Sequence, residues 1–307
     1  MSAHAVARGG SLHRRRALLG YLYISPWLLG FIIFTAGPII ASAYLSLTEY
    51  AAVRPPHFVG LANYDRALFG DDVFWKTLYN TVYYAVIFVP LGIAGSLAAA
   101  LLLNQRIRGQ PLFRTLFYIP SITPTVAATF LWLWILSPEF GPLNSTLALL
   151  GVQGPPWLGS PLWSKPSLIL MGLWGAVGGG TMIVFLASLQ GVPQELYDAA
   201  GIDGATSWQK FVGVTFPMLS PATFFNLVVG LIAAFRVFTT AYVATGGGPD
   251  YSTMFYVLYL YNNAFPYLQM GYASALAWLF MALVLVLVVI QVRIATTWVY
   301  YEGEARS

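Results

Sequence analysis

The side chains that could do chemistry are few in this 307-residue sequence, and their spacing matches no catalytic or metal-binding pattern. The chain has 11 acidic residues, three histidines and no cysteine. Neither His-Glu-x-x-His nor Gly-x-Ser-x-Gly occurs, so the common zinc-helix and serine-nucleophile patterns are missing. A Gly-x-x-x-x-Gly-Lys phosphate loop is missing too. We therefore expect no catalytic residue, no metal site and no cofactor bound by this chain itself.

One loop, 191–219, gathers three acids around a single lysine: Glu195, Asp198, Asp203 and Lys210. Pro193 suits the first turn of a helix, and acids early in that helix meet the positive end of its dipole. Gly204 would permit a sharp turn after this helix. Thr206 or Ser207 could cap a second short helix that stops before Pro217. The loop is therefore predicted to be a helix-turn-helix.

The composition of the chain is too apolar for a soluble protein and indicates a lipid environment. Hydrophobic residues make up 58% and charged residues only 8%, whereas a soluble domain has roughly a quarter charged residues. The mean hydropathy is +0.69. A membrane span needs about 20 apolar helical residues, so the length leaves room for roughly six spans and modest loops. The net charge of +4 lies mostly in short loops and at the N-terminus, which does not suggest nucleic-acid binding.

Six apolar windows are each long enough to cross a bilayer. The fifth contains one cation, Arg236, and the other five contain no charged residue. We therefore predict an all-α membrane protein, a bundle of six transmembrane helices. The windows are 17–47, 77–103, 115–136, 167–190, 222–240 and 271–291.

Orientation follows from the basic residues, because short cytoplasmic loops retain lysine and arginine. Arginines are concentrated in residues 1–16, in the 104–114 loop and in residues 292–307, which predicts cytoplasmic N- and C-termini. The domain between the two terminal segments is 17–291. A cleaved secretory signal is the rival interpretation of the first window, but a signal has only about 7 to 15 apolar residues. By counting spans the 191–219 loop is cytoplasmic, yet it is acidic, which indicates another purpose.

The spacing within this loop resembles the cytoplasmic motif of the membrane subunits of bacterial binding-protein-dependent ATP-binding-cassette importers. That motif has Glu-Ala-Ala, three residues, Gly, nine residues, Ile, one residue, Leu and Pro. The sequence departs from it in three residues of similar chemistry: Asp at 198, Val at 214 and Phe at 216. The matching positions are Asp198, Ala199, Ala200, Gly204, Val214, Phe216 and Pro217.

Short strings elsewhere look like stretches of the carbohydrate branch of this family. They are weak individually, and their order and spacing carry the resemblance over most of the chain. The branch imports oligosaccharides, trehalose- or maltose-like disaccharides and glycerol phosphate. The strings are Gly60-Leu-Ala-Asn-Tyr64, Asn80-Thr81, Gly141-Pro-Leu-Asn144, Thr245-Gly-Gly-Gly-Pro249 and Gly271-Tyr-Ala-Ser-Ala275.

The resemblance implies a multi-pass permease in a bacterial or archaeal cytoplasmic membrane, which translocates a di- or oligosaccharide. It implies four kinds of partner: a second homologous permease subunit, two copies of an ATP-binding subunit, an extracytoplasmic sugar-binding protein and the lipid bilayer. ATP and Mg²⁺ would be bound by the ATP-binding subunits. The 191–219 loop would dock onto such a subunit through Glu195, Asp198, Ala199, Ala200, Gly204 and Pro217.

The main alternative is an ion-coupled secondary transporter. Every aspartate, glutamate and histidine lies outside the six windows, so a buried carboxylate or imidazole relay is not expected. A membrane-embedded enzyme would need a nucleophile with a base or a metal cluster, and neither is seen. Both alternatives are therefore disfavoured by the residues present.

A sugar pathway needs aromatic faces and neutral donors and acceptors more than charges. Arg236 is the one cation inside a window, and it could line the pathway or snorkel from a span end. The run Gly178-Gly-Gly180 could loosen the fourth span or allow close helix packing. Candidate pathway residues are Gly180, Thr181, Asn226, Arg236, Tyr242, Ser274 and Trp278. The identity of the sugar is not readable from the sequence.

Overall fold

The computed structural model describes residues 6–105 and 108–300, so parts of the expected terminal segments, 1–5 and 301–307, lie outside the described residues. The chain divides into two compact units. Unit 1 comprises Met1–Arg66 and Asn263–Trp278, and unit 2 comprises Ala67–Asn262 and Leu279–Ser307. Each unit is considered by itself below.

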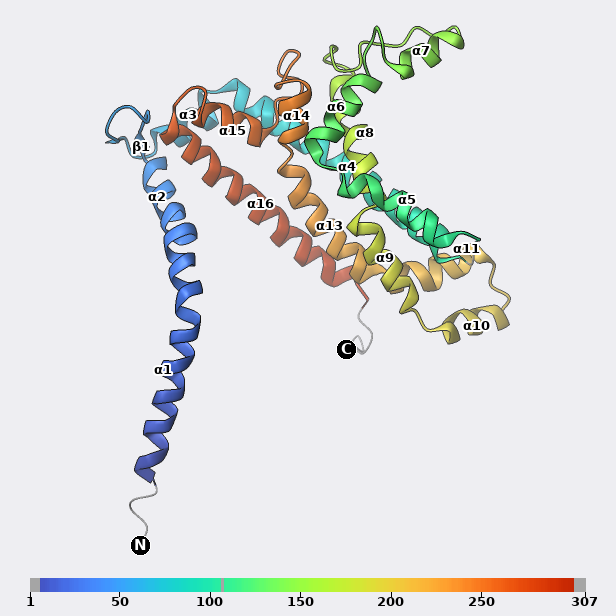
Figure 1. The fold of residues 1–307 in the computed structure, drawn as a ribbon, viewed down its shortest axis with the longest axis horizontal. Coiled ribbons are helices and arrows are strands. Elements are labelled where there is room, and N and C mark those ends of the chain that lie inside the picture. The colour runs from blue at the N-terminus through green and yellow to red at the C-terminus, as the bar shows by residue number, and fades with distance from the viewer. Residues whose placement is uncertain (1–5, 106–107, 301–307) are drawn as a thin grey trace. The chain divides into compact units, whose positions relative to one another are not determined.

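Unit 1 contains one long helical segment followed by a small hairpin (Figure 1). The segment consists of α1 (Val6–Phe31), a π-helical turn η1 (Ile32–Ala36) and α2 (Gly37–Ser46), so its helix begins inside the expected N-terminal segment. Pro38 has no N–H for the Phe34 carbonyl, and the Gly37 N–H bonds instead to the Ile32 carbonyl, five residues back. Two-residue strands β1 (Thr48–Glu49) and β2 (His57–Phe58) pair antiparallel, a small departure from the all-α prediction.

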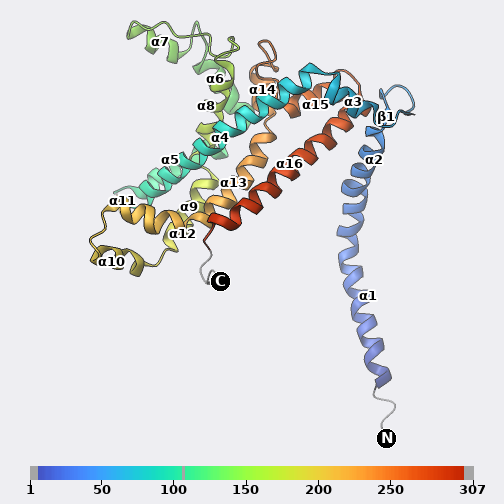
Figure 2. The same ribbon diagram turned by 180° about the vertical axis from the view of Figure 1, so that it is seen from behind.

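Unit 2 is built around the unbroken helix α4 (Asp72–Asn104), which contacts α5, α8, α9 and α13. Figure 2 shows α4 and α13 side by side. The side chain of Asp71 caps the first turn of α4 by accepting a hydrogen bond from the Phe74 N–H. The core lies where α4, α9 and α13 meet, and its buried members include Ala100, Leu103, Phe185 and Leu219.

The remaining helices of unit 2 follow one another along the chain, with a longer connection at 150–163 between α7 and α8. They are α5 (Gln110–Ile122), α6 (Thr125–Ile135), α7 (Pro142–Leu149), α8 (Ser164–Ala176), α9 (Gly180–Gln190), α10 (Gln194–Ile202), α11 (Ser207–Lys210), the π-helical η2 (Phe211–Thr215), α12 (Phe216–Met218), α13 (Ser220–Phe235) and α14 (Thr239–Ala244). Three helices run on into or out of unit 1: α3 (Ala62–Phe69), α15 (Tyr256–Ala264) and α16 (Met270–Trp298).

The six predicted windows all fall on helices, but two of them are not single straight spans. Among the described residues four helices are long and apolar enough to cross a membrane, and six spans result only if two bent pairs count as one span each. α5 and α6 meet at 97°, and α8 and α9 at 47°. The structure is therefore compatible with the six predicted spans if each bent pair counts as one span, but the third and fourth are not single straight helices.

The physical reasons for both bends can be found in the sequence. Pro124 disfavours helical backbone at Thr123, which is extended with φ −70° and ψ 129°. In the fourth window the helix stops at Ala176 and resumes at Gly180 across two further glycines. A Cβ at Gly178 would collide with the backbone carbonyl of Phe117, so this residue serves close packing against α5 as well. The glycines at 178–180 therefore both interrupt the fourth span and allow close helix packing.

Candidate functional site

The 191–219 loop forms a hairpin of two helical arms joined by a tight turn. The first arm is α10, and the Ala205 N–H bonds to the Ala200 carbonyl across its end, a Schellman closure with Gly204 in the left-handed region at φ +73°. A Cβ at Gly204 would meet no atom within 4 Å, so the backbone angle rather than space requires glycine there. Thr206 and Gln209 form a reciprocal capping box at the start of α11.

The two arms are held together at their bases. The Tyr197 hydroxyl of α10 lies 3.0 Å from the hydroxyl of Thr215, which is buried in η2. The π-turn arises because Pro217 has no N–H for the Gly213 carbonyl, and the Phe216 N–H bonds instead to Phe211, five residues back. The hairpin is thus fixed at its turn and at its base, and it presents its tip as a unit.

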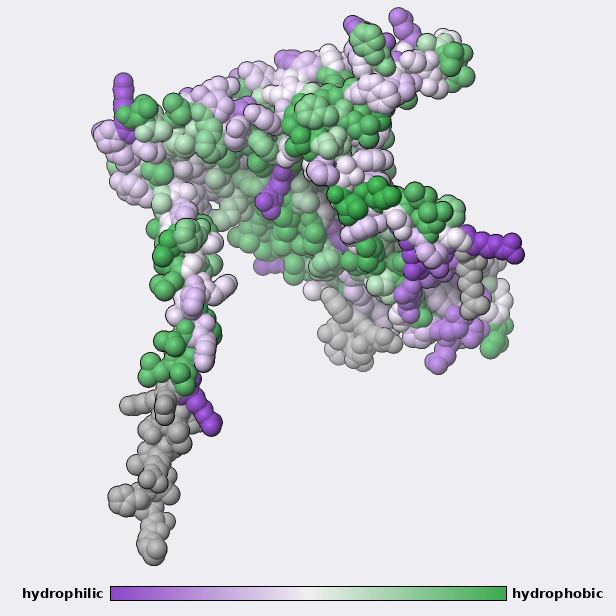
Figure 3. All heavy atoms as spheres, in the orientation of Figure 1, coloured by the Kyte–Doolittle hydropathy of each residue, from purple (hydrophilic) through white to green (hydrophobic). Residues whose placement is uncertain are grey.

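The acids predicted to act in this loop are exposed and have no cationic partner within it. Glu195, Asp198 and Asp203 are all on the surface. Asp198 accepts a hydrogen bond of 3.1 Å from the Gln194 amide, while the one ion pair among the described residues, Lys76–Asp250, lies elsewhere. Figure 3 shows hydrophilic atoms gathered around α10 and α11. Of the other predicted residues, Ala199 is exposed, and Ala200 and Pro217 are half-buried.

Sequence reasoning missed the large apolar side chains on the same hairpin. Ile202 is 88% exposed and Trp208 is 71% exposed, one on each side of the turn. Leu196, Val212 and Phe216 are also exposed. The sequence alone did not separate these residues from Leu219 of the same loop, which is fully buried in the core. Exposed apolar patches of this kind occur at protein–protein and at membrane interaction sites.

Two predicted pathway residues are brought together in unit 2. Thr181 of α9 and Asn226 of α13 line one small cavity, together with Gly230 and residues of α4. Asn226 is buried, and its amide nitrogen has no hydrogen-bond partner among the described residues. An unused buried donor is costly, so this site suits a polar ligand or an ordered water.

The other candidates are not collected at one place. Gly180 is exposed at the start of α9, and Arg236 is exposed just after α13, with no partner for its guanidinium among the described residues. Tyr242 stacks on Phe238 with 5.4 Å between ring centroids. Ser274 and Trp278 belong to unit 1, where the Trp278 indole N–H donates to the Ser42 hydroxyl at 3.2 Å.

A larger polar cavity, which the prediction lacked, lies beside the bend between α5 and α6. It has a volume of about 220 Å³ and is lined by hydroxyl groups, the edge of α8 and the rings of Trp132 and Trp174. The two rings pack edge to face at 6.2 Å, and the buried Trp132 indole nitrogen has no partner among the described residues. Its hydroxyl-bearing residues are Ser121, Thr123, Thr125, Thr129 and Thr240. Pro120 and Pro124 were the signal for this bend.

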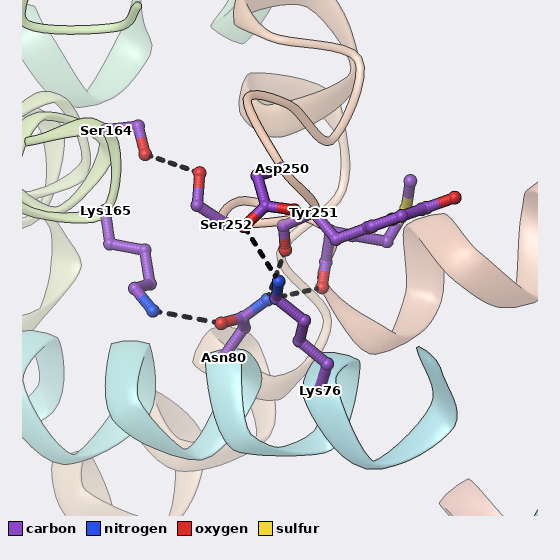
Figure 4. A network of polar contacts seen from close by, with 8 residues as sticks. Lys76, Asn80, Ser164, Lys165, Asp250, Tyr251 and Ser252 are labelled. Carbon is purple, nitrogen blue, oxygen red and sulfur yellow. Dashed lines mark hydrogen bonds and ion pairs between the residues drawn. The ribbon is translucent and has the colours of Figure 1, made fainter. Parts of the chain in front are cut away.

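A polar network joins α4, α8 and the loop before α15 (Figure 4). The buried Asn80 amide donates to the carbonyls of Tyr251 and Met254, and its oxygen accepts from the Lys165 ammonium at 3.0 Å. Lys165 also lies about 5 Å from the ring centroids of two tyrosines of α4. Nearby, Lys76 pairs with Asp250 at 3.2 Å, and the hydroxyls of Ser164 and Ser252 lie 2.8 Å apart. The Asn80-Thr81 string thus belongs to a structural junction.

Comparison with known proteins gives matches along nearly the whole chain. Residues 92–299 match the family described as binding-protein-dependent transport system inner membrane component. The chain is 39% identical over 306 residues to the probable ABC transporter permease protein YesP of Bacillus subtilis, covering 98% of each. It is 34% identical over 286 residues to the trehalose/maltose transport system permease protein MalF of Thermococcus litoralis, covering 92% of this chain and 95% of that one.

A solved structure shares the fold. It is a bacterial alginate ABC transporter in complex with an alginate pentasaccharide-bound periplasmic protein. One of its chains superposes with a TM-score of 0.79 at 24% identity, over 90% of this chain and 93% of that chain. The broken helices of unit 2 are therefore compatible with the architecture of a membrane transporter subunit.

Proposed function

This chain belongs to the binding-protein-dependent transport system inner membrane component family, and on that premise we propose that it is the permease subunit of a sugar-importing ATP-binding-cassette transporter. The observation that carries the proposal is the end-to-end relationship with transport permeases, 39% identical over 98% of both chains in one case. The name of the Thermococcus relative, a trehalose/maltose permease, supports a sugar substrate. A di- or oligosaccharide fits the cavity chemistry described above.

The transporter would work in a bacterial or archaeal cytoplasmic membrane with both termini on the cytoplasmic side. The 191–219 loop would lie on that side too and dock onto an ATP-binding subunit. The exposed acids of α10 and the exposed Ile202 and Trp208 support this role, because a patch of apolar residues with a charged rim is typical of a protein interface. ATP and Mg²⁺ would be held by two copies of that subunit, since this chain has no phosphate loop.

The sugar would be delivered by an extracytoplasmic binding protein and would pass between this chain and a second, homologous permease subunit. The cavity beside the α5–α6 bend supports a neutral, hydroxyl-rich ligand. It offers two indole rings, several hydroxyls and an indole N–H that has no partner in the described part of the chain, and the residues that line it carry no charge. Aromatic faces with a few convergent polar groups are the usual lining of such sites.

The test is to purify the chain with its ATP-binding subunits, second permease and binding protein, and to reconstitute the complex in proteoliposomes. Solute carried by the binding protein is identified by mass spectrometry and then used as the transported probe. We expect uptake that requires ATP on the side of the 191–219 loop and continues when proton and sodium gradients are dissipated. Uptake that follows an ion gradient without ATP would instead support the secondary transporter.

A further inference from the structure

A second surface feature of the 191–219 loop is an apolar pocket at the base of the hairpin. It has a volume of about 270 Å³ and is lined by Leu196, Gly213, Val214, Pro217, Met218 and Tyr300. A dry cavity of about 150 Å³ can hold a benzene molecule, so this one has room for an aromatic or branched aliphatic side chain. No charged residue lines it.

The pocket is preformed by local backbone features. Gly213 and Val214 both lie in the π-turn η2, and π-turns inside helices are often found at functional sites. Gly213 contributes no side chain, and a Cβ placed on it would meet no atom within 4 Å. The wall formed by Tyr300 is anchored, because its N–H donates to the Ser220 hydroxyl at 2.8 Å and that hydroxyl donates to the Pro217 carbonyl at 2.6 Å.

We propose that this pocket receives one apolar side chain of the ATP-binding subunit and so anchors that subunit to the permease. The proposal rests on the function proposed above and specifies how the two proteins engage. Leu196 both lines the pocket and belongs to the exposed apolar surface, so the pocket continues into the face assigned to docking. Glu195 and Asp198 are exposed on α10, the helix that contributes Leu196 to the lining. A buried anchor inside a polar rim is where protein interfaces concentrate their binding energy.

The experiment fills the pocket from the permease side. Gly213→Leu places a side chain where the chain itself has open space, and the backbone there is helical, so the permease should fold normally. We expect the purified permease pair to bind the ATP-binding subunit about tenfold more weakly or worse, since blocked anchors cost that much or more. Val152→Leu, an enlargement at an exposed position outside the loop and outside the lining, should bind like the unmodified protein.

A second experiment, photo-crosslinking, does not depend on whether the Gly213→Leu variant folds normally. A photo-crosslinking amino acid at Met218, in the assembled complex in nanodiscs, should attach to an apolar residue of the ATP-binding subunit. Attachment only to lipid, or to this chain itself, would overturn the proposal, as would equal binding by Gly213→Leu and Val152→Leu. If the unmodified complex does not assemble or transport, the proposed function falls and the pocket proposal with it. Normal transport with a crosslink elsewhere overturns the pocket alone.

Discussion

Two regions of unit 2 differ in whether their side chains find partners within the chain or remain exposed. In the network around Asn80, the buried amide uses both its donors and its acceptor within the chain, and the half-buried Lys165 contacts that amide and two tyrosine rings. In the 191–219 loop the acids have no cation and Ile202 is 88% exposed. The first region satisfies its polar groups within one chain, whereas the second leaves its acids and its apolar side chains exposed.

This contrast separates two kinds of mutational effect. A buried polar group that loses its partner costs the folded subunit about 1–3 kcal/mol. Substituting an exposed residue at a binding surface changes the stability of the isolated subunit little. The substitution lowers the affinity for the partner instead. Substitutions in the network should therefore lower the stability of the isolated permease, and substitutions in the loop should lower its affinity for the ATP-binding subunit.

The largest effect is expected for Asn80→Leu. The change removes three hydrogen bonds, so the Met254 carbonyl and the Lys165 ammonium lose the Asn80 amide, while the Tyr251 carbonyl keeps its hydrogen bond from the Met254 N–H. The free energy of unfolding should fall by about 3 kcal/mol or more, measured by thermal unfolding of the isolated chain in detergent. Asn104→Leu, at an exposed position of the same helix, is the control and should change little. Equal stability of both variants would remove the network from the comparison.

Charge reversal at Asp198 should come next and should spare the lone subunit. Asp198→Lys presents a cation to a partner surface expected to be basic, and like charges across an interface cost several kcal/mol. Retention of the ATP-binding subunit and sugar uptake should both collapse, while thermal stability of the chain stays normal. Asp198→Glu restores the residue usual in the family motif and should be nearly silent. Normal assembly of Asp198→Lys would mean that the acids of the loop face only water.

A smaller effect, of about tenfold in sugar uptake, is expected for Gly204→Trp. The residue has φ +73°, which a tryptophan adopts only at a cost of about 1–2 kcal/mol, and the ring would hold the partner away from the turn. Hydrolysis of ATP should continue with little transport. Asparagine tolerates the left-handed region, so Gly204→Asn should keep most of the uptake. Parallel loss in both variants would point to the glycine itself rather than to its backbone angle.

The smallest effect is expected for Trp132→Phe, which keeps an aromatic face and removes the unpaired indole N–H. The apparent affinity for the transported sugar should fall about fivefold, the worth of one hydrogen bond of roughly 1 kcal/mol. Assembly and stability should not change. Trp134→Phe, at an exposed position two residues along the same helix, is the matched control. If the two variants transport alike, the cavity beside the α5–α6 bend lies off the sugar pathway.

Features that depend on local composition were predictable from the sequence. Apolar windows fell on helices because hydrophobic length decides which segments can enter a bilayer. The family motif was readable because its spacing does not depend on tertiary contacts. The Pro124 bend was readable in principle, but averaging apolar character over residues 115–136 concealed it.

Contacts between residues that are far apart in the sequence were not predictable. No residue near Asn80 in the sequence predicts its contacts with Lys165, 85 residues away, and with the Tyr251 carbonyl, 171 residues away. The pocket of the 191–219 loop likewise needs Tyr300, which is remote in the chain. Charge-poor segments contain few residues that could signal such pairings. Junctions between helices therefore had to be seen in three dimensions.

The exposure of Ile202 and Trp208 has a consequence for the life of the protein before assembly. A copy made without the ATP-binding subunit proposed above displays these apolar side chains on its surface, a feature by which quality-control proteases and chaperones detect incomplete proteins. The proposed docking would hide that surface, so the face that selects the partner would also report whether the partner has arrived. Abundance of this chain in the membrane should therefore follow the supply of the ATP-binding subunit rather than its own rate of synthesis.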